Sequence, residues 1–193
     1  MTARPRLAPD QQLSIEEFLA FTDTRPQEER WELIEGVPIL NPSPIDFHQI
    51  IVTNIVTLLM TEKIARAHTW LPFIGTGTRI PVSKNSLPQP DALVIAGPLT
   101  GSPIAEEAIV IFEVLSRSNT KTDQAWRRKA YASVPNCAHY VTVSLKGVEV
   151  TAYDRATEWA ARTLHGRDGV LDLPALGTAL PLEAIYRYTP IGA

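Results

Sequence analysis

The chain has 193 residues, 45% of them hydrophobic and 20% charged, which suits one globular domain with a sizeable core. Its formal net charge is −3, so the overall charge gives no reason to expect attraction to nucleic acid. A protein with this net charge can still have a local basic groove. The single cysteine excludes an internal disulfide and a cysteine-based zinc site. The N-terminus is polar and shows no signal-peptide pattern, and no apolar run reaches roughly 20 residues. We therefore expect a cytoplasmic protein with no membrane partner.

The first residues predict a tail and a capped helix. Residues 1–12 are rich in proline, glutamine and charge, and they predict a flexible N-terminal tail. A single domain is expected over residues 13–193. Ser14 and Glu17 fit a capping box, which predicts a short helix that ends near Phe21.

A hairpin and a long helix follow. Residues 30–40 predict two strands joined by a tight turn at Glu35-Gly36. After a proline-rich break, Asp46 is the predicted N-cap of a helix over residues 47–67, where apolar side chains recur at helical spacing. Residues 70–82 predict one or two strands interrupted by glycines.

The second half of the chain predicts the rest of a mixed sheet. Apolar runs of strand length alternate there with polar breaks and two helical segments. We expect strands over residues 89–95 and 108–115, a helix over 120–133, strands over 139–143, 148–153 and 158–164, and a final short helix over 181–188. This order indicates one α/β domain.

Two acids, Asp91 and Glu113, stand in apolar strand segments, where an unpaired carboxylate is costly. Side chains alternate between the faces of a strand, so apolar residues surround Glu113 on both faces. If the two strands are antiparallel neighbours, the start of one lies beside the end of the other and the carboxylates converge. A shared Mg²⁺, which prefers oxygen ligands, is then the expected cation. The alternative is a strand end, where Glu113 reaches solvent or pairs with Arg117.

The segment after Glu113 is basic. Such side chains suit a polyanionic substrate, because they hold phosphates and offset charge in a transition state. An ordinary solvated helix face is the other interpretation, and it is preferred when this cluster is taken alone. His48 has no second histidine at helical spacing, so no zinc motif is predicted. The basic residues are Arg117, Lys121, Arg127, Arg128 and Lys129, against Asp123 alone.

In their order and spacing, these segments resemble the Uma-type family of restriction-endonuclease-like proteins, formerly a domain of unknown function, in the PD-(D/E)XK nuclease superfamily. The likeness spans residues 13–188 and implies a single PD-(D/E)XK nuclease-like domain, with a mixed central β-sheet flanked by helices. It rests on Leu13-Ser14-Ile15-Glu16-Glu17-Phe18-Leu19, Trp31-Glu32-Leu33-Ile34-Glu35-Gly36, His48, Gln89-Pro90-Asp91, Phe112-Glu113-Val114-Leu115-Ser116, Asp123, Tyr131, Val134-Pro135 and Tyr140-Val141.

The resemblance implies a metal site and a basic residue beside it. Asp91 and Glu113 would bind Mg²⁺ or Mn²⁺, joined by Glu32, with Glu35 as the alternate. The family places its lysine four residues before the tyrosine of the following helix, and Arg127 stands there in this chain.

The exchange of that lysine bears on catalysis. Lys129 lies two positions further along, which turns its side chain by about 200° around the helix axis, so it does not simply replace the missing lysine. Arg127 stabilises negative charge, but it stays protonated and is a poor proton acceptor. Catalytic roles are therefore expected for Asp91, Glu113 and Glu32, together with Arg127 or Lys129.

The expected function is that of a metal-dependent endonuclease that hydrolyses phosphodiester bonds of nucleic acid, with DNA as the expected partner. Expected substrate contacts are His48, Glu35, Gln89, Arg117 and Lys121. Two alternatives stay open: a catalytically silent nuclease-fold domain for binding or assembly, and a metal-dependent hydrolase of smaller phosphate compounds. A homodimer is also considered, because cutting two strands suits two sites, but the sequence predicts no interface.

Overall fold

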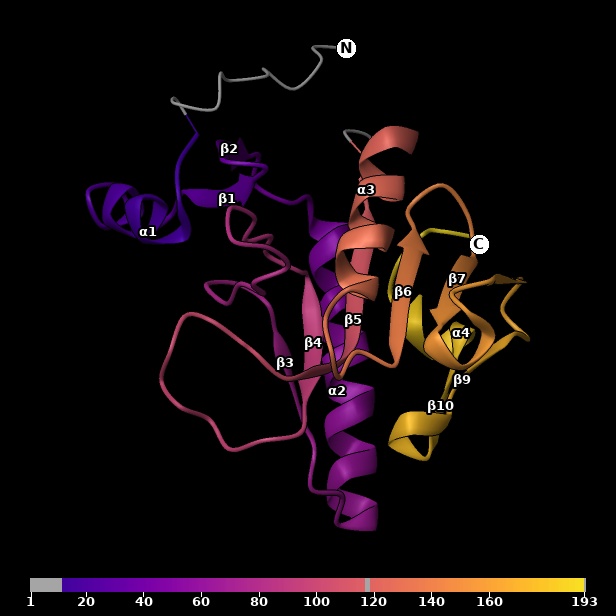
Figure 1. The fold of residues 1–193 in the computed structure, drawn as a ribbon. Helices are drawn as coiled ribbons and strands as arrows, with labels where there is room; N and C mark the ends of the chain where they lie inside the picture. The colour runs from indigo at the N-terminus through magenta and orange to yellow at the C-terminus, as the bar shows by residue number, and fades with distance from the viewer. Residues whose placement is uncertain (1–11, 117–118, 193) are drawn as a thin grey trace.

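A computed structural model of the protein describes residues 12–116 and 119–192. Its centre is a six-stranded sheet in the order β3-β4-β5-β6-β7-β8 (Figure 1). Only β5 and β6 pair in parallel, and the other neighbours are antiparallel, so the predicted mixed sheet is confirmed. The strands are β3 (Leu71–Ile74), β4 (Ala92–Ile95), β5 (Ala108–Leu115), β6 (His139–Ser144), β7 (Glu149–Asp154) and β8 (Ala161–His165).

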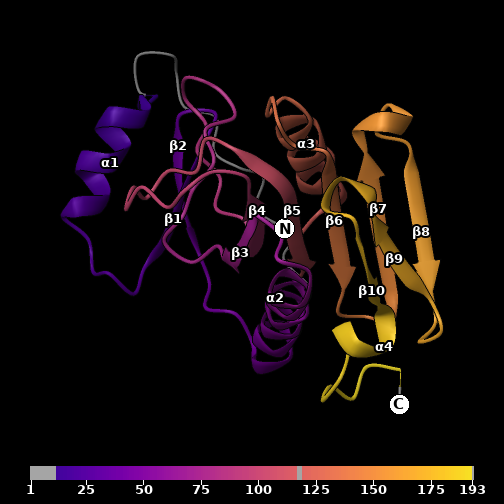
Figure 2. The ribbon, with the colours of Figure 1, turned by 90° about the horizontal axis from the view of Figure 1, so that it is seen from below.

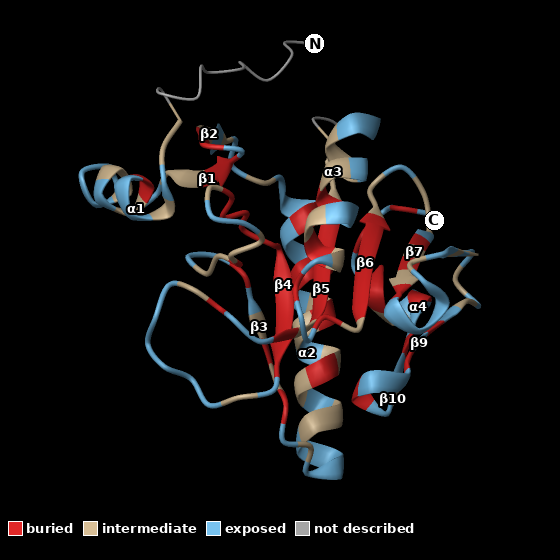
Figure 3. Ribbon diagram, in the orientation of Figure 1, coloured by how far each residue is buried: buried red, intermediate tan, exposed pale blue. Residues whose placement is uncertain are grey.

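The two long helices cover opposite faces of this sheet. Figure 2 shows α2 (Asp46–Arg66) on one side of β4 and β5, and α3 (Lys121–Ala132) on the other. The alternation predicted for β5 is confirmed, because Val110, Phe112 and Val114 pack on the α2 side and Ile111 packs with Tyr131 of α3. Burial is concentrated in the middle strands (Figure 3). Glu113 lies on the same face of β5 as Ile111, the face toward α3, so its side chain leaves the strand within the hydrophobic core on that side.

A smaller N-terminal layer lies beside the β3 edge of the sheet (Figure 1). It contains α1 (Ile15–Asp23) and the antiparallel hairpin of β1 (Arg30–Ile34) and β2 (Val37–Asn41). Backbone hydrogen bonds between Leu33 and Leu87, 3.3 and 2.7 Å long, tie the hairpin to the segment that leads into β4. This link brings Glu32 of β1 toward Asp91.

The C-terminal segment completes the layer on the α2 side. Beyond a 3₁₀ turn at Arg155–Thr157, it forms a second hairpin of β9 and β10, with another 3₁₀ turn between them and a short helix at its end. Their leucines join the same core as α2. The elements are β9 (Val170–Leu173), the turn Pro174–Leu176, β10 (Thr178–Pro181) and α4 (Leu182–Ile185).

Local sequence signals located most element starts correctly. The capping box of Ser14 and Glu17 is confirmed, and Thr120 caps α3 through the Asp123 amide. The prediction of Asp46 as an N-cap is wrong, because Ile45 holds that position and Asp46 is the first helical residue.

The predicted strands differ from the structure mainly in their bounds. Residues 70–82, where one or two strands were predicted, contain one, β3, followed by irregular backbone with isolated bridges. The strand expected over residues 89–95 begins at Ala92, so Asp91 lies just before it. The strand expected from residue 158 begins at Ala161, after a turn in which Glu158 and Trp159 have positive φ. The hairpin of β9 and β10 was not predicted. In the described part of the chain, no helix has the length and apolar character needed to cross a membrane.

Candidate active site

The antiparallel pairing of β4 and β5 brings the two lone acids together. Ala92 lies opposite Phe112 in the register, so Asp91, just before β4, falls beside Glu113. The Asp91 amide donates to the Phe112 carbonyl over 3.1 Å, and the Val114 amide donates to Asp91 Oδ2 over 2.8 Å. The side chain of Asp91 thus satisfies a β5 amide at the point where β4 begins. The two strands are antiparallel neighbours, which is the condition on which the convergence of the two acids depended.

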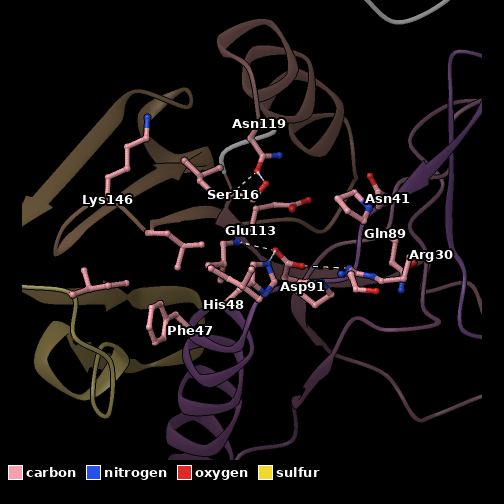
Figure 4. Close-up of a pocket in the computed structure, with 18 of the residues that line it drawn as sticks. Arg30, Asn41, Phe47, His48, Gln89, Asp91, Glu113, Ser116, Asn119 and Lys146 are labelled. Carbon is pink, nitrogen blue, oxygen red and sulfur yellow. Dashed lines mark hydrogen bonds and ion pairs between the residues drawn. The ribbon is translucent and has the colours of Figure 1, made fainter. Parts of the chain in front are cut away.

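Both acids line a single pocket with a volume of about 950 Å³. It opens where β1, β4 and β5, the N-terminus of α2 and the turn between β6 and β7 come close together. Figure 4 shows Asp91 and Glu113 near its centre, with Arg30 on one side and Phe47 and Lys146 on the other. Each acid is less than a tenth exposed. The pocket therefore has an acidic floor between cationic side chains.

Asp91 has a histidine and an arginine as side-chain partners. His48 Nε2 lies 3.1 Å from Asp91 Oδ2, and Arg30 Nη2 lies 3.4 Å from Oδ1. Burial alone would raise the pKa of the Asp91 carboxyl. The hydrogen bond and charge of His48, the Val114 amide and the Arg30 charge outweigh burial and hold that pKa below its usual 3.8. Asp91 is therefore ionised at neutral pH.

Arg127 of α3 bridges the other two acids. Its Nη2 lies 2.6 Å from Glu32 Oε2, and its Nη1 lies 2.9 Å from Glu113 Oε1. The Tyr131 hydroxyl, one helical turn further on, also donates to Glu113 Oε1 over 2.8 Å. Glu32 Oε1 accepts a hydrogen bond from the Gln89 amide over 2.7 Å. Arg127 thus joins the first hairpin, the central strand and α3 in one buried network.

The single guanidinium of Arg127 cannot neutralise both Glu32 and Glu113, so the pKa values of these two carboxyl groups shift in opposite directions. Burial would raise the pKa of Glu32, but the Arg127 charge and several hydrogen bonds outweigh it, so this pKa is lowered from its usual 4.5. Burial raises the pKa of Glu113 to about 8; the Arg127 charge opposes this rise, and the nearby negative charges of Asp91 and Glu32 add to it. Glu113 therefore carries a proton at neutral pH in the metal-free protein.

The fit of a divalent cation depends on which carboxylate oxygens remain open. Glu113 Oε2 makes no hydrogen bond within the described residues, and Asp91 Oδ1 has only the long contact to Arg30. Two such oxygens suit Mg²⁺, which takes one or two carboxylates and keeps several waters. Both oxygens of Glu32 are engaged, by Arg127 and Gln89. Residues 12–116 and 119–192 contain no group of three or more His, Cys, Asp or Glu side chains arranged to hold a metal ion.

Gly75 fixes the backbone that carries Asp91. A Cβ atom at this position would lie 1.9 Å from the Pro90 carbonyl oxygen, closer than any side chain allows. The Gly75 amide donates to the Asp91 carbonyl over 2.9 Å, and Gln89 Nε2 donates to the Gly75 carbonyl over 3.0 Å. The glycine that interrupts the predicted strand is therefore the residue against which the Gln89-Pro90-Asp91 segment packs.

The remaining predicted site residues divide between pocket and surface. His48 and Gln89 line the pocket with the acids and Arg127. Lys121 and Lys129 are exposed on α3 and do not line it. Glu35 lies in the hairpin turn, where its Oε1 accepts a hydrogen bond from Trp126 Nε1 over 3.1 Å. Arg117 lies outside the described residues.

Several pocket residues were not predicted from the sequence. Arg30 precedes Trp31 in an ordinary strand pattern, and Lys146 lies between two predicted strands. Phe47 was counted as part of an apolar helix face, although it is 36% exposed beside the pocket. No local signal marks these residues, because segments far apart in the chain bring them to one opening.

The fold is shared with a protein described as a nuclease. Among solved structures, the chain is similar to one from Anabaena variabilis ATCC 29413, described as "a putative nuclease belonging to DUF820", with a TM-score of 0.73 and 16% sequence identity. The match covers 90% of this chain and 97% of that one. At this identity the likeness establishes the fold alone, and it confirms the predicted restriction-endonuclease-like architecture.

The sequence itself establishes the family. A family model described as "Uma2: Putative restriction endonuclease" matches residues 15–183. The chain therefore belongs to this family, and the resemblance inferred from its motifs is confirmed. The comparison with curated proteins gives no match.

Proposed function

We propose that this protein is a metal-dependent endonuclease that hydrolyses phosphodiester bonds of DNA. The observation that carries the proposal is the meeting of Asp91 and Glu113 on the floor of one pocket. Glu113 Oε2 has no hydrogen bond within the described residues, and Asp91 Oδ1 has only the 3.4 Å contact to Arg30. Asp91 and Glu113 would hold Mg²⁺ or Mn²⁺. Such a cation, when bound, lowers the pKa of a coordinated water and offsets charge on a phosphate. Family membership and the fold both support this class of reaction.

The side chains around the acids would orient them and stabilise charge. The Val114 amide and His48 fix Asp91, while Tyr131 and Arg127 both donate to Glu113 Oε1 and leave Oε2 open. Glu32, the third proposed ligand, would have to exchange its contact with Arg127 for the metal. Arg127 cannot accept the proton of an attacking water, because a guanidinium stays protonated. Its role would be to balance negative charge beside the scissile phosphate.

A second candidate is a nuclease-fold domain that binds nucleic acid or a partner without cleaving. The contact that favours it is the bridge from Arg127 to Glu32 and Glu113, in which a guanidinium already supplies the positive charge that the acids require. This candidate predicts binding to nucleic acid but no turnover in the wild-type protein. Cleavage that depends on a divalent metal would eliminate it.

The test is a cleavage assay with purified wild-type protein. We expect DNA to be cut when Mg²⁺ or Mn²⁺ is present and to stay intact after chelation with EDTA, because the acid pair alone provides no Lewis acid. A nucleotide with a single phosphoester bond serves as competitor, which separates a DNA nuclease from a hydrolase of small phosphate compounds. Cutting that persists in excess EDTA would contradict the metal-dependent proposal.

Metal binding should be linked to a proton on Glu113. Burial holds the pKa of this carboxyl at about 8, so a cation that binds it below that pH must displace a proton. The Mg²⁺ affinity is therefore expected to rise as the pH increases from 6 to about 8, by up to roughly tenfold per unit, and to level off above. Calorimetry in buffers of different ionisation enthalpy would count the proton released. An affinity that does not change with pH would show that Glu113 is not a ligand.

A further inference from the structure

The pocket is lined by both polar and apolar side chains. Arg30, Gln89 and the two acids are among the polar ones. The apolar ones come from the segment before α2, from α2 itself, from the β6–β7 turn and from the C-terminal segment, and we call them the apolar lip. They are Pro42, Pro44, Ile45, Phe47, Leu145 and Ile191.

The apolar lip is open while the acids are deep. Ile45 is 58% exposed and Phe47 is 36% exposed, whereas Asp91 and Glu113 are only 8% and 6% exposed. A phosphate that meets the acids must therefore enter the pocket, whereas Ile45 and Phe47 present apolar surface to solvent at its lining. In Figure 4, Phe47 lies next to His48, the residue that contacts Asp91, so the Phe47 ring is close to the Asp91 end of the acid pair.

A double helix does not match this shape or this chemistry. Its phosphates lie on the outside of a wide cylinder, and its base faces are stacked and hidden. An unpaired strand is thin, and it exposes base faces that stack on aromatic side chains. Enzymes that act deep in a pocket take nucleotides from single strands or out of the duplex. The charges agree with such a strand, because Arg30 and the exposed Lys146 lie on opposite sides of the acids.

We propose that the pocket admits an unpaired strand, with the scissile phosphate at Asp91 and Glu113 and a neighbouring base packed on Phe47. The inference rests on the proposed function in one respect, that nucleic acid is the substrate. It adds that the substrate is single-stranded or locally unpaired, and that Phe47 positions it. Ile45 extends the same apolar surface beyond the Phe47 ring. Lys146 contacts a backbone phosphate at the point where the strand leaves the pocket.

The experiment measures binding rather than cleavage. Fluorescence anisotropy compares one short labelled oligonucleotide, free or annealed to its complement, with Ca²⁺ in place of Mg²⁺. We expect the wild-type protein to bind the unpaired form at least roughly tenfold more tightly. Phe47→Ala should weaken that binding by roughly tenfold and leave the weak duplex binding unchanged, while Phe47→Trp should preserve both. Ile64→Ala is the matched control, because Ile64 is 75% exposed on the same helix, near its other end.

The outcomes separate this inference from the nuclease proposal. Preferential binding of the unpaired strand that depends on the Phe47 ring supports the inference, even when no metal yields cleavage. Equal affinity for both forms, with no effect of Phe47→Ala, overturns it, whether or not the protein cleaves. Size-exclusion chromatography covers a further outcome: if Phe47→Ala dissociates a dimer and leaves strand binding intact, the lip is an interface between two copies and the inference is wrong.

Discussion

Replacing Arg127 with methionine is expected to destabilise the protein by about 3–5 kcal/mol at pH 8. The substitution removes the guanidinium but leaves Glu32 and Glu113, which are 2% and 6% exposed, without their cationic partner. Methionine fills much of the same volume, so the loss reports the uncompensated buried charge rather than a cavity. Urea denaturation followed by circular dichroism measures it.

Lys129→Met is the matched control for this loss. Lys129 lies on the exposed face of the same helix, and its removal should change stability by less than about 0.5 kcal/mol. The deficit of Arg127→Met should shrink as the pH falls from 8 to 5. Glu113 already holds a proton near neutral pH, and Glu32, whose pKa rises once the guanidinium is gone, is neutralised as the pH falls. A double variant with Glu32→Gln should regain part of the stability. If Arg127→Met were as stable as Lys129→Met, the buried bridge would contribute nothing to folding.

Arg127→Lys separates stability from turnover. A single ammonium group lacks the planar fork that reaches Glu32 and Glu113 at once, so one of the two contacts should weaken. Part of the stability should be lost, while the variant carries the lysine that the family resemblance leads us to expect at this position. If Arg127→Lys cleaves DNA faster than the wild-type protein but unfolds more easily, Arg127 stabilises the fold at the expense of turnover.

The acid pair was predictable because its signal is local. An isolated carboxylate in an apolar strand run stands out in the sequence, and two consecutive strands leave few possible pairings. The register of β4 and β5 then determines that Asp91 lies beside Glu113. The same local logic located the capping box of Ser14 and the start of the helix predicted from residue 120.

The cationic partners of these acids were harder to predict, because they depend on tertiary contacts. Arg127 and Glu32 are 95 positions apart, and Arg30 and Asp91 are 61 apart. The sequence assigned Arg127 to the site through the family pattern, but nothing near Glu32 reveals that one guanidinium would hold both acids. Gly75 is a similar case, since its close contact with Pro90 appears only once β3 and the segment before β4 lie together.

Replacing Asp91 with asparagine is expected to reduce metal-dependent cleavage by roughly 1000-fold or more, because the loss of one charged ligand removes several kcal/mol of transition-state stabilisation. The fold should survive, since the amide oxygen can still accept the hydrogen bond that the Val114 amide gives to Asp91 Oδ2 over 2.8 Å. Single-turnover cleavage, Mn²⁺ binding and thermal unfolding are measured on the same sample.

Asp172→Asn controls for the loss of one negative charge, because Asp172 is exposed on β9 and lies outside the pocket. It should keep wild-type cleavage and metal affinity. If Asp91→Asn folds and still cleaves, the reaction does not take place at this acid pair. If the wild-type protein binds Mn²⁺ through Asp91 but cuts no DNA, the site holds a cation without turnover, and Arg127→Lys becomes the first variant to test for cleavage.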